Sequence, residues 1–133
     1  MGKLNLRKEM FNINSDLEEL WKRIVFNICV TNTDDHLRNH GFILSENGWI
    51  LSPAYDINPV EEGTGLKLNI SENDNSLDLD FALDVIEYFR LDKKKVLKII
   101  EKIKNIVSSC RNVAERYHLS KTEQALMEKA FRN

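Results

Sequence analysis

Residues 15–51, SDLEELWKRIVFNICVTNTDDHLRNHGFILSENGWIL, contain an apolar helical pattern, a polar loop and a hairpin pattern in direct succession. In the first part, apolar side chains recur at steps of three and four, which predicts a helix from about Asp16 to Val30 with one wide apolar face. Ser15 and Glu18 have the spacing of a capping box, so we expect the helix to begin there. The apolar face consists of Leu17, Leu20, Trp21, Ile24, Val25, Ile28 and Cys29.

The last part of this stretch predicts a β-hairpin. Two short apolar runs, 41–44 and 49–51, flank the sequence Ser-Glu-Asn-Gly. We expect Asn47 and Gly48 to supply the positive φ angles of a tight hairpin turn. Pro53 has no backbone N–H to donate, so the second strand should end before it.

The rest of the chain is mostly helical in pattern. Residues 66–70 alternate weakly enough to form a short strand, and 71–76 read as a polar loop. A short helix is expected over 80–90, and Asp92 should cap a long helix whose apolar stripe continues to Tyr117. Ser120 and Glu123 form a second capping box that opens a final helix. The sequence therefore predicts a mainly α fold with a small β-hairpin (α+β), in a single domain over 1–133.

Composition narrows the class of protein. The chain has 133 residues, 42% of them hydrophobic and 30% charged, as in ordinary globular domains. A net charge of −2 gives no general reason to expect nucleic-acid binding. We expect no membrane span, no signal peptide and a cytoplasmic location. Cys29 and Cys110 fall on apolar stripes, and both are expected to be buried, reduced thiols.

The polar loop carries the candidate chemistry. Asp34 and Asn39 are five positions apart, and Asp56 follows beyond the hairpin. Phosphoryl transfer uses such a set, with one carboxylate handling the attacking hydroxyl while an amide oxygen and a second carboxylate hold Mg²⁺ on the nucleotide phosphates. The alternative is that Asn32, Asp34 and Asp35 only end a helix and fill a turn. The Pro-Ala-Tyr-Asp sequence ending at Asp56, at hairpin distance, favours the site.

Other ligands fit these residues poorly. His36 and His40 have a spacing that can bind zinc on a helix, but here they lie in a turn with no third histidine or cysteine nearby. A calcium loop begun at Asn32 would need glycine where Leu37 stands. The lysines of the expected long helix could form an anion-binding patch, but their positions favour a solvated outer face. Its apolar stripe is either core or a docking face for a partner.

The stretch from Phe26 to Phe42, followed by Trp49 to Pro59, resembles the C-terminal domain of HipA-type serine/threonine kinases, the toxin halves of bacterial toxin–antitoxin pairs. The resemblance is dense over residues 20–60 and looser beyond. It implies that Asp34 is the catalytic Asp, that Asn39 and Asp56 bind Mg²⁺ at an ATP site, and that Asn32, His36 and Arg38 support the motif. His36 would hold the loop in shape, and Arg38 stands where the family commonly has Lys.

The resemblance also implies partners. Such kinases use an N-terminal lobe with a phosphate-covering loop and a lysine, whereas the glycines of this chain, at 2, 41, 48, 63 and 65, form no phosphate-binding motif. We therefore expect the lobe to be absent from this chain, and we expect a separate N-terminal lobe or an antitoxin as partner and a protein as substrate. A non-catalytic binding or regulatory module derived from such a kinase is the alternative.

Overall fold

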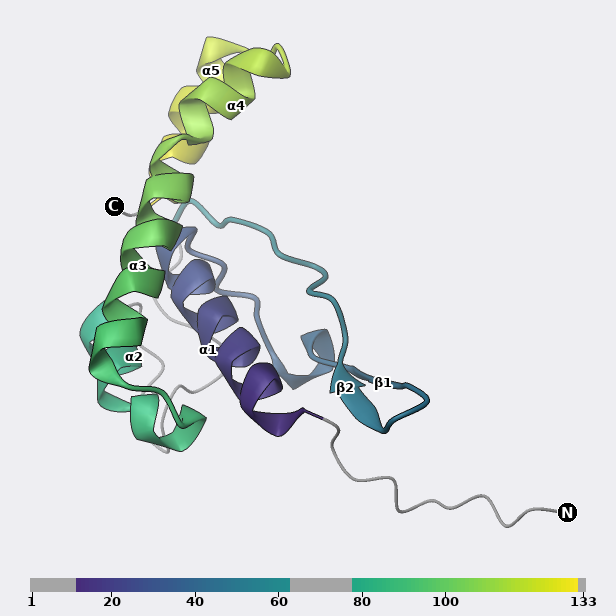
Figure 1. Ribbon diagram of the computed structural model, residues 1–133. Coiled ribbons are helices and arrows are strands. Elements are labelled where there is room, and N and C mark those ends of the chain that lie inside the picture. Colours follow the sequence, from purple (N-terminus) through teal and green to yellow (C-terminus); the bar gives the residue numbers. More distant parts are fainter. Residues whose placement is uncertain (1–11, 63–77, 132–133) are drawn as a thin grey trace, which may run out of the picture.

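A computed structural model describes residues 12–62 and 78–131 of the chain (Figure 1). The described part is mainly helical with one two-stranded antiparallel sheet, which confirms the predicted fold class. The strand predicted at 66–70 and the loop at 71–76 lie outside the described residues. The elements, in chain order, are α1 (Ile13–Cys29), η1 (Leu37–Asn39, a 3-10 turn), β1 (Phe42–Leu44), β2 (Trp49–Leu51), α2 (Leu79–Asp84), η2 (Ile86–Phe89, also 3-10), α3 (Lys93–Ser108), α4 (Cys110–Arg116) and α5 (Lys121–Glu128).

The core lies where α1 packs against α2 and α3 (Figure 1). Trp21 is completely buried at its centre, and its indole N–H donates to the carbonyl oxygen of Ala82 in α2 at 2.8 Å. A buried indole needs such a partner, so this bond ties the two helices together at the largest core side chain. The other fully packed apolar side chains are Val25, Ile28, Cys29, Ala82 and Val96.

The start of α1 differs from the prediction. The helix begins at Ile13, and its N-cap residue Asn12 makes no side-chain capping bond, so Ser15 does not act as the cap. Glu18 instead forms ion pairs with Lys22 in α1 and with Lys95 in α3. Hydrogen bonds from Lys95 and then Lys22 lower the pKa of Glu18, so this stabilisation is present at neutral pH and is lost as the pH falls through that pKa.

The hairpin forms as predicted, with Phe42 opposite Leu51 and Leu44 opposite Trp49. Its turn is different, because only Gly48 has a positive φ, 145°. The loop is closed by the Ser45 backbone N–H, which donates to the Gly48 carbonyl at 2.8 Å, and by the Ser45 hydroxyl, which donates to the same oxygen at 2.6 Å. Asn47 therefore does not have the positive φ that was predicted for it, and the Ser45 side chain helps to close the turn.

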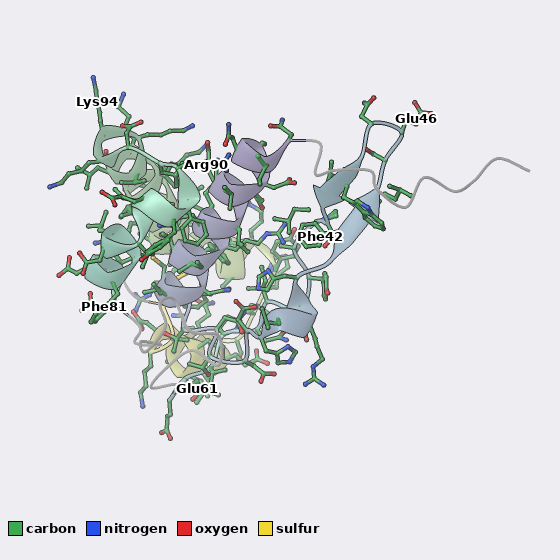
Figure 2. The ribbon with its side chains drawn as sticks, turned by 90° about the horizontal axis from the view of Figure 1, so that it is seen from below. Phe42, Glu46, Glu61, Phe81, Arg90 and Lys94 are labelled. Atoms are coloured by element: carbon green, nitrogen blue, oxygen red, sulfur yellow. The ribbon has the colours of Figure 1, made fainter. Side chains whose placement is uncertain are left out.

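The hairpin projects from the helices rather than packing between them. Figure 2 shows Phe42 and Glu46 on one side of α1, with Arg90 and Lys94 on the other. Although they are apolar, Phe42, Ile43 and Leu44 are each about half exposed. An isolated two-stranded hairpin is marginally stable in water. Its attachment to the body includes the Arg23 guanidinium of α1, which donates to the Ser52 carbonyl at 2.5 Å.

The two helices predicted in the second half are each interrupted. The segment expected as one helix over 80–90 consists of α2, capped by Asp78, and η2, which ends at Arg90 with φ 56°. The long helix is capped by Asp92 as predicted but breaks at Ser109 between α3 and α4. The hydroxyls of Ser108 and Ser109 donate to the carbonyls three residues earlier, a local bond that competes with the helix and bends it.

The long apolar stripe is buried in its first part and exposed in its last part. Val96, Ile100 and Val107 are buried core residues of α3, whereas Val113 of α4 and Tyr117, which follows α4, are exposed. In Figure 1, α4 and α5 extend beyond the end of α1 as an arm. The capping box of α5 is confirmed, since Ser120 and Glu123 exchange both side-chain-to-backbone bonds. No helix in the described ranges has the length and apolarity needed to cross a membrane.

The two cysteines are free thiols in different environments. Cys29 is 1% exposed, and burial raises the pKa of its thiol, whereas Cys110 is only partly buried. Because the thiolate is the reactive form, we expect a disulfide reagent such as DTNB to modify Cys110 in the native protein and Cys29 only after unfolding. Absorbance at 412 nm measures this, and a Cys110→Ser variant should show no early phase. Early release of both thiols would contradict the burial of Cys29.

Candidate active site

The site is formed where the loop after α1 meets the segment after the hairpin. Several hydrogen bonds join these segments, which are distant in sequence. The Tyr55 hydroxyl donates to the carbonyl of Arg38 at 2.5 Å, and the Val60 backbone N–H donates to the carbonyl of Thr31 at 2.9 Å. The hairpin reverses the chain and these bonds fix the return, so the predicted motif residues are held on facing stretches of backbone.

Two residues with left-handed backbone bracket the site. Thr31 has φ 54° and Asp56 has φ 57°. The conformation is costly for a β-branched residue such as threonine, and it persists only where surrounding contacts fix it. Thr31 is completely buried, and its hydroxyl donates to the carbonyl of Ala130 at 2.5 Å. Asp tolerates this region better, and the turn at Asp56 sets the direction of its carboxylate.

Asn39 and Asp56 are in direct contact. The Asn39 Nδ2 group donates to Asp56 Oδ2 at 3.2 Å, although the residues are 17 positions apart. A carboxylate only accepts hydrogen bonds, so this contact turns the amide NH₂ toward Asp56 and leaves Oδ1 as the amide's acceptor atom. Asn39 is buried and Asp56 is exposed, and the other carboxylate oxygen of Asp56 accepts from Asn58 Nδ2 at 2.7 Å. The contact therefore joins a buried amide to an exposed carboxylate.

This donor set fits Mg²⁺ better than a softer metal. Mg²⁺ takes oxygen ligands and is usually bound by one or two carboxylates, with waters and phosphate oxygens completing its octahedron. Asn39 and Asp56 offer that number of protein ligands, and Asp56 is exposed to solvent. Within the described ranges, no three His, Cys, Asp or Glu side chains gather into a metal-binding group. The residues therefore fit a cation held jointly with a phosphate ligand.

The remaining predicted residues occupy the same loop. Asp34 is exposed, and Asn32 is buried. The carbonyl of His36 accepts from the Asn39 backbone N–H at 2.8 Å, which starts η1 and sets the orientation of the metal-ligand candidate. Arg38 is exposed, and its carbonyl is the one that Tyr55 contacts.

A buried polar network holds this loop against α1. The sequence analysis did not identify Asp35, the residue at the centre of the network. Asp35 is only 4% exposed, and its two carboxylate oxygens contact Asn27 Nδ2 at 3.0 Å and His40 Nε2 at 2.8 Å. Asn27 Oδ1 in turn accepts from Asn32 Nδ2 at 3.1 Å. One feature of the sequence could have indicated this network, because Asn27 is a polar residue within the apolar pattern of the first helix. Asp35 thus fixes both ends of the loop that presents Asp34 and Asn39.

Unpartnered polar atoms are concentrated at this loop. Among the described residues, five buried side-chain nitrogen or oxygen atoms lack a hydrogen-bond partner, and three belong to Asn32, His36 and His40. Buried polar groups are nearly always paired, so a local excess of exceptions is typical of a functional site or of sites that water completes. The loop is therefore the part of the described structure where a ligand or water would relieve the most unsatisfied groups.

Removing the Asp35 carboxylate should destabilise the domain. Asp35→Ala leaves Asn27 Nδ2 and His40 Nε2 buried without acceptors, and we expect a loss of about 3 kcal/mol in the free energy of unfolding. The neighbouring exposed Asp34→Ala should change it by less than about 1 kcal/mol. Urea unfolding followed by circular dichroism gives both values. Equal effects of the two substitutions would show that the network does not hold the loop.

Comparison with known proteins gives the chain a family. The family model for the HipA-like C-terminal domain matches residues 4–110. The chain belongs to the HipA-like C-terminal domain family. The match includes α1, the loop with Asp34 and Asn39, the hairpin, Asp56 and α3, whereas α5 lies beyond it. No curated protein and no solved structure matches the chain.

Proposed function

We propose that this HipA-like domain is the catalytic lobe of a serine/threonine protein kinase. ATP would supply the phosphoryl group, and Mg²⁺ would neutralise charge on its phosphates. Asn39 Oδ1 and the Asp56 carboxylate would hold the metal, and Asp34 would position the attacking hydroxyl and accept its proton. The family supports a protein hydroxyl as acceptor, a bacterial cytoplasmic setting and a toxin–antitoxin pairing.

The observation that carries the proposal is the contact between Asn39 and Asp56. Two residues separated by a hairpin meet at 3.2 Å, with an amide and a carboxylate side by side. In protein kinases the catalytic-loop Asn and an Asp beyond it hold the metal ions in this way. The buried Asp35 network and the bonds from Tyr55 and Val60 preorganise the loop, as a catalytic site requires.

The exposed hairpin supports a second lobe as partner. Phe42, Ile43, Leu44 and Trp49 place four large apolar side chains, 53, 48, 50 and 37% exposed, on a projecting two-stranded element beside the site. Phe42, Leu44 and Trp49 share one face of the hairpin, because Leu44 pairs with Trp49 and side chains alternate along a strand, and exposed apolar surface of this kind is typical of protein contacts. We propose that a nucleotide-clamping N-terminal lobe packs on this hairpin and closes the ATP site over Asn39 and Asp56.

The test is transfer of radiolabelled γ-phosphate from Mg-ATP. The chain is assayed alone and together with a separately expressed N-terminal lobe of a HipA-type kinase, with autophosphorylation and a mixed protein extract as acceptors. We expect incorporation with the lobe present and little without it, because the sequence contains no glycine-rich phosphate loop. Absence of incorporation in both settings would contradict the kinase assignment.

The second candidate is a binding or regulatory module that has the kinase fold without turnover. The observation that favours it is the lack of a phosphate-loop motif among the five glycines of the sequence. The same assay separates the two candidates. A module would bind the added lobe or an antitoxin through the hairpin, so a Phe42→Ser/Trp49→Ser variant would lose the partner while wild type binds it without phosphate transfer.

A further inference from the structure

A groove of about 470 Å³ runs between α1 and α3, and neither Asn39 nor Asp56 lines it. Its apolar lining comes from three segments and consists of Phe26 of α1, Ile57, and Ile99, Ile103 and Ile106 of α3. Phe26, Ile57, Ile99 and Ile103 are only partly buried against the core, and Ile106 is 56% exposed. The groove therefore offers an apolar floor that remains open in this structure.

The rim of this groove is strongly basic. Lys22, Arg23, Lys95, Lys98 and Lys102 line it, with Glu19 as the single acidic lining residue. The whole chain carries a net charge of −2, so this local surplus is opposite in sign to the molecule. Lys22 and Lys95 share an ion pair with Glu18, while Lys98 and Lys102 form no ion pair with any described residue. As predicted, Lys95, Lys98 and Lys102 of α3 are exposed to solvent, and the structure shows that they also line an apolar groove.

Arg23 adds a buried positive charge to the wall of this groove. Its side chain is 7% exposed, Nε contacts Glu19 at 3.1 Å, and Nη2 donates to the Ser52 carbonyl at 2.5 Å. Its Nη1 atom is buried without a partner among the described residues, on a side chain that lines the groove. A buried guanidinium nitrogen without an acceptor is unfavourable, and a carboxylate is its best complement.

We propose that this groove binds an acidic amphipathic segment of a partner protein. The lysines at 95, 98 and 102 are spaced by three and four residues, so they follow α3 for about 10 Å at 1.5 Å per residue. A partner helix that lies along α3 would match both the spacing of the lysines and the apolar floor. Such a helix would carry Asp or Glu at the same spacing, with its apolar residues facing the floor. Helix-in-groove recognition uses this arrangement, with charges setting orientation and choice of partner.

The groove also reaches the candidate active site. Ala54 and Ile57, which flank Asp56 in sequence, contribute to its wall. An occupant would contact the segment that positions the Asp56 carboxylate. Binding of the acidic segment does not depend on phosphoryl transfer, so it can be measured separately from kinase activity.

The experiment is a selection of random phage-displayed peptides on the whole chain, with measurement of the recovered peptides by fluorescence anisotropy. We expect enrichment of peptides that carry acidic residues and Leu, Ile or Phe at helical spacing. Lys98→Glu/Lys102→Glu should weaken their binding by about tenfold or more, because two opposite charges at the rim become like charges. The matched control, Lys93→Glu/Lys94→Glu, reverses two exposed charges of the same helix that do not line the groove, and it should weaken binding less than about twofold.

Each other outcome overturns the proposal. These outcomes are no enrichment, enrichment of peptides without an acidic surplus, or equal affinity for wild type and Lys98→Glu/Lys102→Glu, with circular dichroism showing that both variants are folded. Phosphatidylserine vesicles and single-stranded DNA are tested in parallel. If these bind with the same lysine dependence while no peptide does, the groove recognises an anionic surface or nucleic acid instead of a protein segment.

Discussion

Asp34→Asn is expected to reduce phosphate transfer by about 10²–10⁴-fold, the usual contribution of a positioned general base. The substitution keeps the size of the side chain and removes the group that would accept the hydroxyl proton. Asp34 is exposed and asparagine keeps its size, so the fold should be preserved. Initial rates of γ-phosphate incorporation, in the presence of the added N-terminal lobe, measure the effect.

A matched control separates this role from a general effect of charge. Asp84→Asn removes one carboxylate from an exposed position in α2, away from the loop, and it should leave the rate within about twofold of wild type. If Asp34→Asn retains the wild-type rate, Asp34 is not the base. If both variants lose activity equally, the loss reflects net charge and not the position of Asp34.

Trp21→Ala is expected to lower the free energy of unfolding by about 3–5 kcal/mol, the range for removal of a large buried aromatic side chain. Trp21 is completely buried, and its loss also leaves the Ala82 carbonyl without the indole donor at 2.8 Å. Such a change is a large share of the stability of a small domain, so the variant can be mostly unfolded. Urea unfolding followed by far-ultraviolet circular dichroism measures it.

Trp21→Phe keeps the prediction testable if the alanine variant does not fold. Phenylalanine retains much of the apolar volume but donates no hydrogen bond, so its loss should be smaller, about 1–3 kcal/mol. Trp49, which lies on the hairpin and is 37% exposed, is the matched control, and Trp49→Phe should change stability by less than about 1 kcal/mol. Equal losses at positions 21 and 49 would contradict the location of the core.

The parts of the fold that the sequence predicted are those governed by local periodicity. The apolar face of α1, the hairpin and the Ser120–Glu123 capping box each depend on residues close in the chain. The errors occurred where side chains found distant or competing partners. Glu18 pairs with Lys95 in α3 instead of completing a capping box. Ser108 and Ser109 bond to their own helix and interrupt it, which an apolar stripe does not reveal.

The candidate site likewise has one part that the sequence predicted and one part that it did not. The spacing of Asp34, Asn39 and Asp56 was readable from the sequence, and the structure brings the last two into contact. Their roles in metal binding and catalysis stay predictions. The buried contacts that hold this loop could not be predicted from the sequence. The contacts of Asp35 with Asn27 and His40 depend on how the loop folds back on α1. Asp35 adjoins Asp34 in sequence, yet one carboxylate is buried and the other exposed.

The central claim, that Asn39 and Asp56 form a cation site, is tested most directly by paramagnetic broadening in nuclear magnetic resonance spectra. Mn²⁺, which shares the oxygen-ligand preference of Mg²⁺, is titrated into the labelled chain together with a non-hydrolysable ATP analogue. We predict that the signals of Asn39 and Asp56 broaden first and that Asp56→Asn abolishes this, whereas Asp84→Asn does not. Broadening centred elsewhere, or unchanged in Asp56→Asn, would contradict the assignment of the site.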